Sequence, residues 1–208
     1  IFSLPFHLTR FFRPTLLEVF SLTNSDLGDA FAIYGIAAML AYFPGGFLAD
    51  RYSIRLLMTG SLLATALGGI YLLTIPDSYK LSLLYGYWGI SSILFFWAAL
   101  IKATRQWGGV FSQGKAFGFL DGGRGMAAAI FATVIVWIFS TILPENKELI
   151  SNSDRIHALQ IVIVYYTCIT FLTGLILWFT LPLETFEKKQ KNSKTVLNNF
   201  NFFNVTIK

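Results

Sequence analysis

The stretch that decides the fold is GGFLADRYSIR at residues 45–55, where a long apolar run ends and charged side chains follow at once. Asp50 and Arg51 come first, and Arg55 follows four residues later. A charge cluster directly behind an apolar segment is typical of a membrane helix that ends in a charged loop. The composition of the whole chain bears on this interpretation.

The chain carries too few charged residues to form the polar surface of a protein that is soluble in water. Of its 208 residues, 55% are hydrophobic, 17% are aromatic and only 13% are charged. Ordinary soluble domains carry roughly 25% charged residues. We therefore expect lipid to surround most of the chain. No catalytic triad, phosphate-binding loop or metal-binding motif is present, so we expect neither an enzyme nor a cofactor, metal or nucleic-acid partner.

Five apolar segments are each long enough to cross a bilayer as a helix, which takes about 20 residues. They occupy residues 27–49, 56–75, 81–101, 116–143 and 156–181. Their apolar runs are continuous and not alternating, which favours helices over the strands of a barrel. The sequence therefore predicts an all-α membrane protein.

Residues 1–22 allow two interpretations. The stretch PFHLTRFFRPTLLEVF contains aromatic residues and leucines together with Arg10, Arg13 and Glu18. It is either the outer part of a truncated first spanning helix or an interfacial segment whose arginines extend to lipid headgroups. The first interpretation brings the number of spanning helices to six.

Basic residues concentrate in every second connection along the series of apolar segments. The joins after the first, third and fifth of the five segments carry the tail EKKQKNSK and the residues Arg51, Arg55, Lys102, Arg105 and Lys115. The two other joins mix basic with acidic residues. By the positive-inside rule, the basic joins and the C-terminal tail face the cytoplasm. We expect a multi-pass protein of a bacterial-type inner membrane.

The cluster of Asp50, Arg51 and Arg55 then lies in a cytoplasmic turn about six residues long. Asp50 lies at a helix C-terminus, where the helix dipole disfavours a negative charge, so it needs a compensating partner. An acid held by exchangeable partners is a plausible latch. The alternative is a plain loop whose arginines only fix the orientation of the chain.

Residues 46–55 resemble the loop 2–3 signature of the major facilitator superfamily, whose usual form is G-x-L-A-D-R-x-G-R-R. The matching residues are Gly46, Leu48, Ala49, Asp50, Arg51 and Arg55. Ser53 stands where the signature usually has Gly, and Ile54 where it often has Arg. The D-R-x-x-x-R form is similar to the organophosphate/phosphate exchanger branch. The glycine-rich segment near residue 118 weakly resembles the nitrate/nitrite porters.

This resemblance implies the fold and its missing partner. Residues 1–185 would form a six-transmembrane-helix bundle, the N-terminal half of a major facilitator fold, and residues 186–208 the start of a cytoplasmic linker or a tail. A C-terminal six-helix half would complete the protein, with a small-molecule solute bound between the halves near the midplane. Gly46, Asp50, Arg51 and Arg55 would hold the cytoplasmic side closed and release it during alternating access.

Charged side chains inside spanning segments are costly and are candidates for substrate or coupling roles. Asp121 and Arg124 form either a functional pair or a plain intrahelical ion pair. In the organophosphate branch a first-helix arginine binds the anion, which would make Arg10 or Arg13 its counterpart; the alternative is interface anchoring. Lys102 ends the fourth of the six expected helices, and it either faces the cavity or anchors that helix at the cytoplasmic surface.

Glycines are frequent in the apolar segments. Gly114, Gly118 and Gly122 recur at every fourth position, a spacing that lets helix backbones approach closely in lipid. We expect close packing there, and packing or bending at Gly45 and Gly68.

These observations favour a secondary active transporter that moves a small polar organic solute by alternating access. The arginines favour an anionic solute, and the transport would be coupled to protons as a symporter or to a counter-solute as an antiporter. Two alternatives stay open at this point. One is a non-transporting six-helix scaffold or receptor, and the other is a half-size unit that must dimerise.

Overall fold

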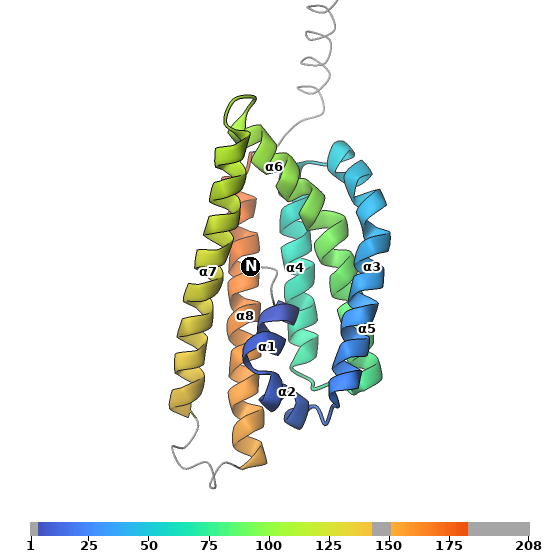
Figure 1. The fold of residues 1–208 in the computed structure, drawn as a ribbon, viewed down its shortest axis with the longest axis vertical. Coiled ribbons are helices and arrows are strands. Elements are labelled where there is room, and N and C mark those ends of the chain that lie inside the picture. The colour runs from blue at the N-terminus through green and yellow to red at the C-terminus, as the bar shows by residue number, and fades with distance from the viewer. Residues whose placement is uncertain (1–3, 143–150, 183–208) are drawn as a thin grey trace, which may run out of the picture.

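The computed structural model describes residues 4–142 and 151–182, and the regular structure in this part is helical (Figure 1). The expected tail at residues 186–208 lies outside the described residues. The helices, in chain order, are α1 (Leu4–Phe11), α2 (Arg13–Val19), α3 (Asn24–Arg51), α4 (Ile54–Leu72), α5 (Ser78–Ile90), the π-helix η1 (Ser91–Trp97), α6 (Ala98–Gly108), α7 (Gln113–Ile142) and α8 (Asn152–Thr180).

Five helical stretches are long and apolar enough to span a membrane: α3, α4, the continuous α5–η1–α6, α7 and α8. The predicted number of long apolar segments and the all-α membrane fold are confirmed. The boundaries differ where local chemistry decides them. Helix α3 begins earlier because Thr23 and Asp26 form a capping box. Helix α4 ends at Leu72, since the backbone turns at Ile75, with φ of 51°, before Pro76.

Helices α1 and α2 pack into the bundle through one apolar stripe. Its residues recur at every fourth position and are all buried: Leu8, Phe12, Leu16 and Phe20. They share a core cluster with Leu159 and Ile163 of α8 and Ile135 of α7. The backbone breaks at Phe12, just before Pro14 in the first turn of α2. Burial of the stripe supports the interpretation of residues 1–22 as part of a first bundle helix.

Helices α3, α4, α5 and η1 pack closely because glycines at their contacts carry no side chain. A Cβ atom on Gly89 would lie 2.6 Å from the Tyr34 carbonyl oxygen, and one on Gly45 would lie 3.0 Å from the Leu94 carbonyl oxygen. A Cβ atom on Gly68 would lie 2.4 Å from Nε1 of the buried Trp88. The packing expected at Gly45 and Gly68 is therefore confirmed.

The glycines of α7 behave differently. At Gly114, Gly118 and Gly122, a Cβ atom would meet no atom of the described residues within 4 Å. The expectation of close packing at these glycines is wrong for the part of the chain that the structure describes. Their spacing gives α7 a smooth face that this bundle does not cover.

The antiparallel helices place charge unequally at the two ends of the bundle. Figure 1 shows the end of α3, all of α6 and the start of α7 at one end, which we call the basic end. Its basic residues are Arg51, Arg55, Lys102, Arg105 and Lys115. The other end, where α2 ends and α3 and α8 begin, we call the acidic end. Its acidic residues are Glu18, Asp26, Asp29, Asp77 and Asp154.

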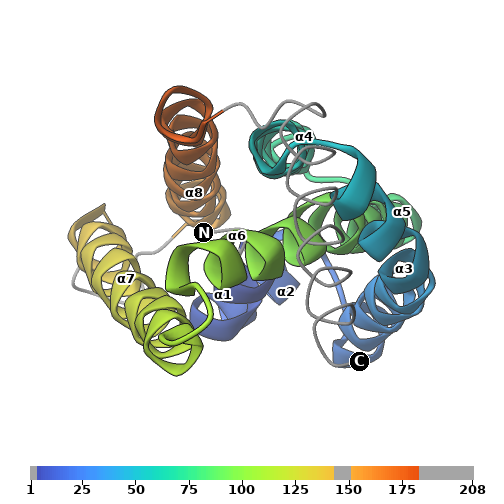
Figure 2. The same cartoon turned by 90° about the horizontal axis from the view of Figure 1, so that it is seen from above.

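Viewed from the basic end, α7, α8, α4 and the neighbouring pair of α3 and α5 are arranged around α1, α2 and α6 (Figure 2). The two predicted basic joins within the described residues therefore share one end of the molecule. That this end faces the cytoplasm stays a prediction.

Candidate functional site

The turn between α3 and α4 contains only Tyr52 and Ser53, since α3 ends at Arg51 and α4 begins at Ile54. It is shorter than the expected six residues because both helices continue into the charge cluster. The Ser53 side chain accepts a hydrogen bond from the Leu56 backbone N–H at 3.3 Å and so caps α4. The serine that replaces the usual glycine of the signature thus starts the next helix.

Two charges of this cluster oppose the helix dipoles. Asp50 lies in the last turn of α3, where the dipole is negative, and Arg55 lies in the first turn of α4, where it is positive. Lys102 of α6, in contrast, is a charge that the dipole of α3 favours. Its Nζ donates a hydrogen bond of 2.8 Å to the carbonyl oxygen of Ala49, next to the exposed Asp50. A cation at a helix C-terminus is favourable, so Lys102 stabilises the end of α3.

The arginines of the cluster stack on aromatic rings. The Cζ atom of Arg51 lies 4.1 Å from the ring centroid of Phe47 within α3. The Cζ atom of Arg55 lies 4.1 Å from the ring centroid of Trp178, near the end of α8. The Arg55 Nε is buried and has no hydrogen-bond partner among the described residues. Together with Lys102, these contacts tie one short turn to α3, α6 and α8.

The sequence allowed two positions for Lys102: facing the cavity or at the membrane surface. The structure places its ammonium group on the backbone of α3, beside the signature residues. Neither composition nor spacing shows this contact, because its acceptor is a main-chain oxygen 53 positions away.

Asp121 and Arg124 contact one another within α7. Nη1 of Arg124 lies 3.4 Å from Oδ1 of Asp121, and their side chains are 48% and 70% exposed, respectively. At 1.5 Å per residue they lie roughly 12–17 Å along α7 from Gln113, well inside its apolar length. The Arg124 Cζ also lies 5.6 Å from the ring centroid of Trp97, the last residue of η1. The pair therefore faces a second helix.

The π-helix η1 is a feature that the sequence did not predict. Its wider turns are held by buried hydroxyl groups: Ser61 donates to the Ser91 carbonyl oxygen at 2.6 Å, and the Tyr34 hydroxyl lies 3.0 Å from Ser92 Oγ. Short π-helical segments occur often at functional sites. Trp97, which contacts Arg124, lies five residues before Lys102 on the same continuous helix. One helix thus connects the intramembrane pair to the charged turn.

The structure does not bring Arg10 and Arg13 to the level of Arg124. Nη2 of Arg13 donates a hydrogen bond of 2.7 Å to Asn24 Oδ1 at the acidic end. Arg10 is exposed, with its guanidinium 5.7 Å from the Phe11 ring centroid. Phe12, which directly follows α1, contacts Phe139 at 4.8 Å between centroids. Phe139 is fifteen residues beyond Arg124, which corresponds to ~22 Å along α7.

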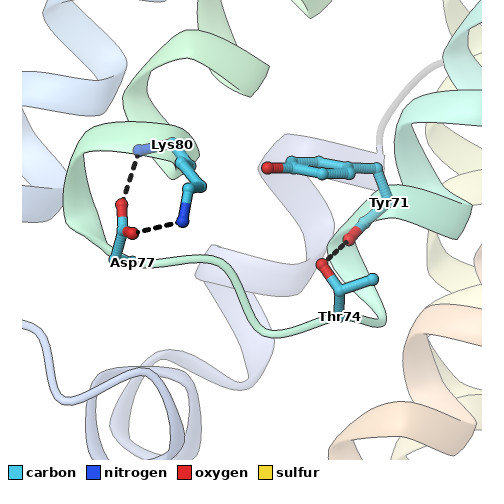
Figure 3. A network of polar contacts seen from close by, with 4 residues as sticks. All are labelled: Tyr71, Thr74, Asp77 and Lys80. Carbon is cyan, nitrogen blue, oxygen red and sulfur yellow. Dashed lines mark hydrogen bonds and ion pairs between the residues drawn. The ribbon is translucent and has the colours of Figure 1, made fainter.

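The acidic end is held by side-chain hydrogen bonds. Figure 3 shows Asp77, which caps α5 by accepting bonds from the Lys80 backbone N–H at 2.9 Å and from Lys80 Nζ at 2.8 Å. The bond from the Lys80 side chain is the main reason why the pKa of Asp77 lies below its ordinary value. Ser78 donates to Asp26 of α3 at 3.3 Å. Arg155 of α8 pairs with Glu18 of α2.

With this geometry in place, the comparisons with known proteins decide the family. The sequence model of the Major Facilitator Superfamily matches residues 2–204, almost the whole chain. The chain belongs to the major facilitator superfamily. It is therefore a multi-pass integral membrane protein of a transporter family, and the family resemblance of residues 46–55 is confirmed.

Three curated proteins are similar at 28% identity. The inner membrane protein YqcE of Escherichia coli K12 aligns over 83% of this chain and 39% of its own length. The inner membrane protein YihN of the same strain aligns over 87% and 40%, respectively. The uncharacterized MG294 homolog of Mycoplasma pneumoniae aligns over 94% and 43%. The chain thus spans about two fifths of the length of these relatives. No solved structure matches it significantly.

Proposed function

We propose that this chain forms the first helix bundle of a secondary transporter that moves a small anionic organic solute across an inner membrane by alternating access. The observation that carries the proposal is the charged turn at the basic end. Its neighbours Lys102 and Trp178 reach it from α6 and α8, so helices separated in sequence meet at the signature residues. A plain loop that only set orientation would not need these contacts.

The basic end faces the cytoplasm in this proposal, following the positive-inside rule. Asp50, Arg51 and Arg55 form the latch of the closed cytoplasmic side. Two features favour exchangeable partners: charges that oppose their helix dipoles, and the buried Nε of Arg55, which lacks a partner in the described part of the chain. Opening would exchange these contacts, with Lys102 holding the end of α3 in the closed state.

Arg124 is the residue that we propose for binding the solute. Its guanidinium is half exposed, lies deep within the apolar length of α7 and is shared between Asp121 and the Trp97 ring. An anionic carboxylate or phosphate can form a bidentate pair with arginine and replace the Asp121 contact. If solute binding moved Trp97, Lys102 would move with it, since the two residues are five positions apart on one continuous helix. Proton or counter-solute coupling would act on this same pair.

A second six-helix bundle is the partner that we propose for the uncovered glycine faces. Gly46, Gly114, Gly118 and Gly122 have no described neighbour within 4 Å of an added Cβ atom. Small residues on an uncovered face let another helix approach closely in lipid. The length of the relatives, of which this chain covers about two fifths, supports the same partner.

The test is an uptake screen of the full-length protein in proteoliposomes. The probes are glycerol 3-phosphate, glucuronate and lactate as anions, with glucose and uridine as neutral solutes. We expect saturable uptake of at least one anion and none of the neutral probes. Uptake of a neutral probe alone would contradict the anion assignment, and uptake of none of the five would contradict the proposed substrate class.

The latch is tested in the same assay with Asp50→Asn. Loss of a charge-assisted contact costs about 1.5–3 kcal/mol, so we expect uptake to fall about 10- to 100-fold with normal membrane insertion. Asp29→Asn is the matched control, because Asp29 lies on the same helix near the acidic end, and it should transport normally. Equal rates for Asp50→Asn and the parent protein would overturn the latch.

A further inference from the structure

A groove of about 360 Å³ runs between α4 and α5 near the acidic end. Its residues include Leu67, Tyr71, Lys80, Leu83, Leu84 and Tyr87. Leu67, Tyr71, Leu83 and Tyr87 are exposed on the surface of the bundle. The groove lies on α4 and α5, on the side of the bundle away from the α7 glycine face that we assign to the second bundle, so the proposal places it against lipid.

The groove has one closed apolar end and one charged end. Towards the middle of the bundle, the Tyr87 hydroxyl donates a hydrogen bond of 2.7 Å to the Ala64 carbonyl oxygen and so bridges α5 and α4. At the other end Lys80 lines the groove, and Asp77 lies just outside it, 2.8 Å from the Lys80 ammonium; both side chains are more than half exposed. Figure 3 shows the Tyr71 ring extending towards Lys80 above the loop that joins the two helices.

The charged end offers two opposite charges side by side at the depth where a membrane helix begins. Lys80 is a cation whose Nζ can donate up to three hydrogen bonds, and Tyr71 carries a phenolic donor nearby. Asp77 is an acceptor with one oxygen on the Lys80 backbone N–H and the other on the Lys80 side chain. Tyrosine and lysine at this depth are common interfacial residues. The carboxylate beside them is what separates this site from a simple cationic anchor.

We propose that this groove binds one phospholipid whose zwitterionic headgroup carries an ammonium group, as in phosphatidylethanolamine. The lipid phosphate accepts hydrogen bonds from Lys80 and Tyr71, and the headgroup ammonium donates to Asp77. The upper part of one acyl chain lies between Leu67 and Leu83. From Lys80 to Tyr87 the groove has ~10 Å of helix length, enough for part of a chain.

Phosphatidylglycerol fits this site less well, because it carries the same phosphate but no ammonium group to pair with Asp77, so the occupied site would hold one uncompensated negative charge. The inference depends on the membrane location of the chain. It does not depend on the latch or on the solute, so its failure and that of the proposed transport function are distinguishable.

The test is native mass spectrometry of the full-length protein in detergent, with phosphatidylethanolamine or phosphatidylglycerol added at equal concentration. We expect one bound phosphatidylethanolamine with at least fivefold preference over phosphatidylglycerol. Lys80→Gln should lower its binding at least fivefold. Asp77→Asn should abolish the preference between the two lipids, since asparagine still caps α5 but carries no charge.

Two further variants separate the groove from general effects of charge. Leu83→Trp fills the groove without changing any charge and should block both lipids. Lys115→Gln removes one positive charge at the basic end and should bind like the parent protein. The proposal is overturned if Lys80→Gln and Leu83→Trp bind as the parent does, or if the parent binds phosphatidylglycerol as tightly as phosphatidylethanolamine.

Discussion

The two ends of the bundle are held together by different interactions. At the acidic end, hydrogen bonds between side chains join separate helices, with both partners inside this bundle: Arg13 with Asn24, Ser78 with Asp26, and Arg155 with Glu18. At the basic end, the joining contacts include the stacking of Arg55 on Trp178 and the bond from Lys102 to the Ala49 carbonyl oxygen.

This difference shows which end can rearrange. A hydrogen bond between two side chains weakens steeply when its angle or length changes. A guanidinium stacked on a ring tolerates small sliding, and a lysine can exchange one acceptor for another because its ammonium is a compact charge on a flexible stem. The acidic end is therefore suited to stay fixed, and the basic end is suited to change partners. Substitutions at three contacts test this comparison.

Lys102→Gln should have the largest effect of the three. It removes the cation from the end of α3, a charge-assisted contact of about 1.5–3 kcal/mol, and so destabilises the closed basic end. The equilibrium should shift at least tenfold towards the state that is open at the basic end, and uptake should fall because the opposite state becomes rare. Initial uptake rates in proteoliposomes, with the best anionic probe, measure this loss.

Arg105→Gln is the control, since Arg105 is an exposed cation three residues further along α6. It should retain the parent rate. If Lys102→Gln also transports normally, the contact with Ala49 is only structural and the basic end is not the mobile one.

A smaller effect is expected where Arg55 stacks on Trp178. Arg55→Lys keeps the charge but loses the planar stacking on Trp178, which is exposed. Such a contact is worth about 0.5–1 kcal/mol, so uptake should fall roughly two- to fivefold. Trp178→Leu should cause a similar loss, and the double variant should be no worse than either single one, because both remove the same contact.

The comparison is Trp137→Leu, a change at an exposed tryptophan of α7. It should leave uptake unchanged. Losses that add up in the double variant would mean that Arg55 and Trp178 act separately, and the proposed link between the turn and α8 would be lost.

The parts of this fold that the sequence predicted follow from simple physics. In lipid, a continuous run of about twenty apolar residues satisfies its backbone hydrogen bonds as a helix. The five long spans could therefore be predicted directly from the sequence. The charged turn was found because the apolar runs end abruptly at residues 49–55 and match a family signature. The shared end of the basic joins followed from counting charges in successive loops.

What the sequence did not show depends on contacts between helices. The π-helix η1 is supported by Ser61 and Tyr34 from two other helices, and nothing in SSILFFW itself requires an extra residue per turn. Lys102 binds a backbone oxygen, which any sequence provides. The glycines of α7 have the spacing of packed glycines, but their partner is not among the described residues. As substrate or coupling residues, Arg10, Arg13, Lys102, Asp121 and Arg124 stay predictions.

The smallest effect is expected at the acidic end, for Arg155→Gln. Arg155 pairs with Glu18, but their side chains are 34% and 52% exposed, and an ion pair at the surface contributes only about 0.2–1 kcal/mol. Thermal unfolding in detergent should show a small decrease in stability, and uptake should match the parent rate because this end does not change partners. Glu18→Gln should give the same result, with no further loss in the double variant. If either change slows uptake as strongly as Lys102→Gln, both ends rearrange during transport, and hydrogen bonding within the bundle does not distinguish a fixed end from a mobile one.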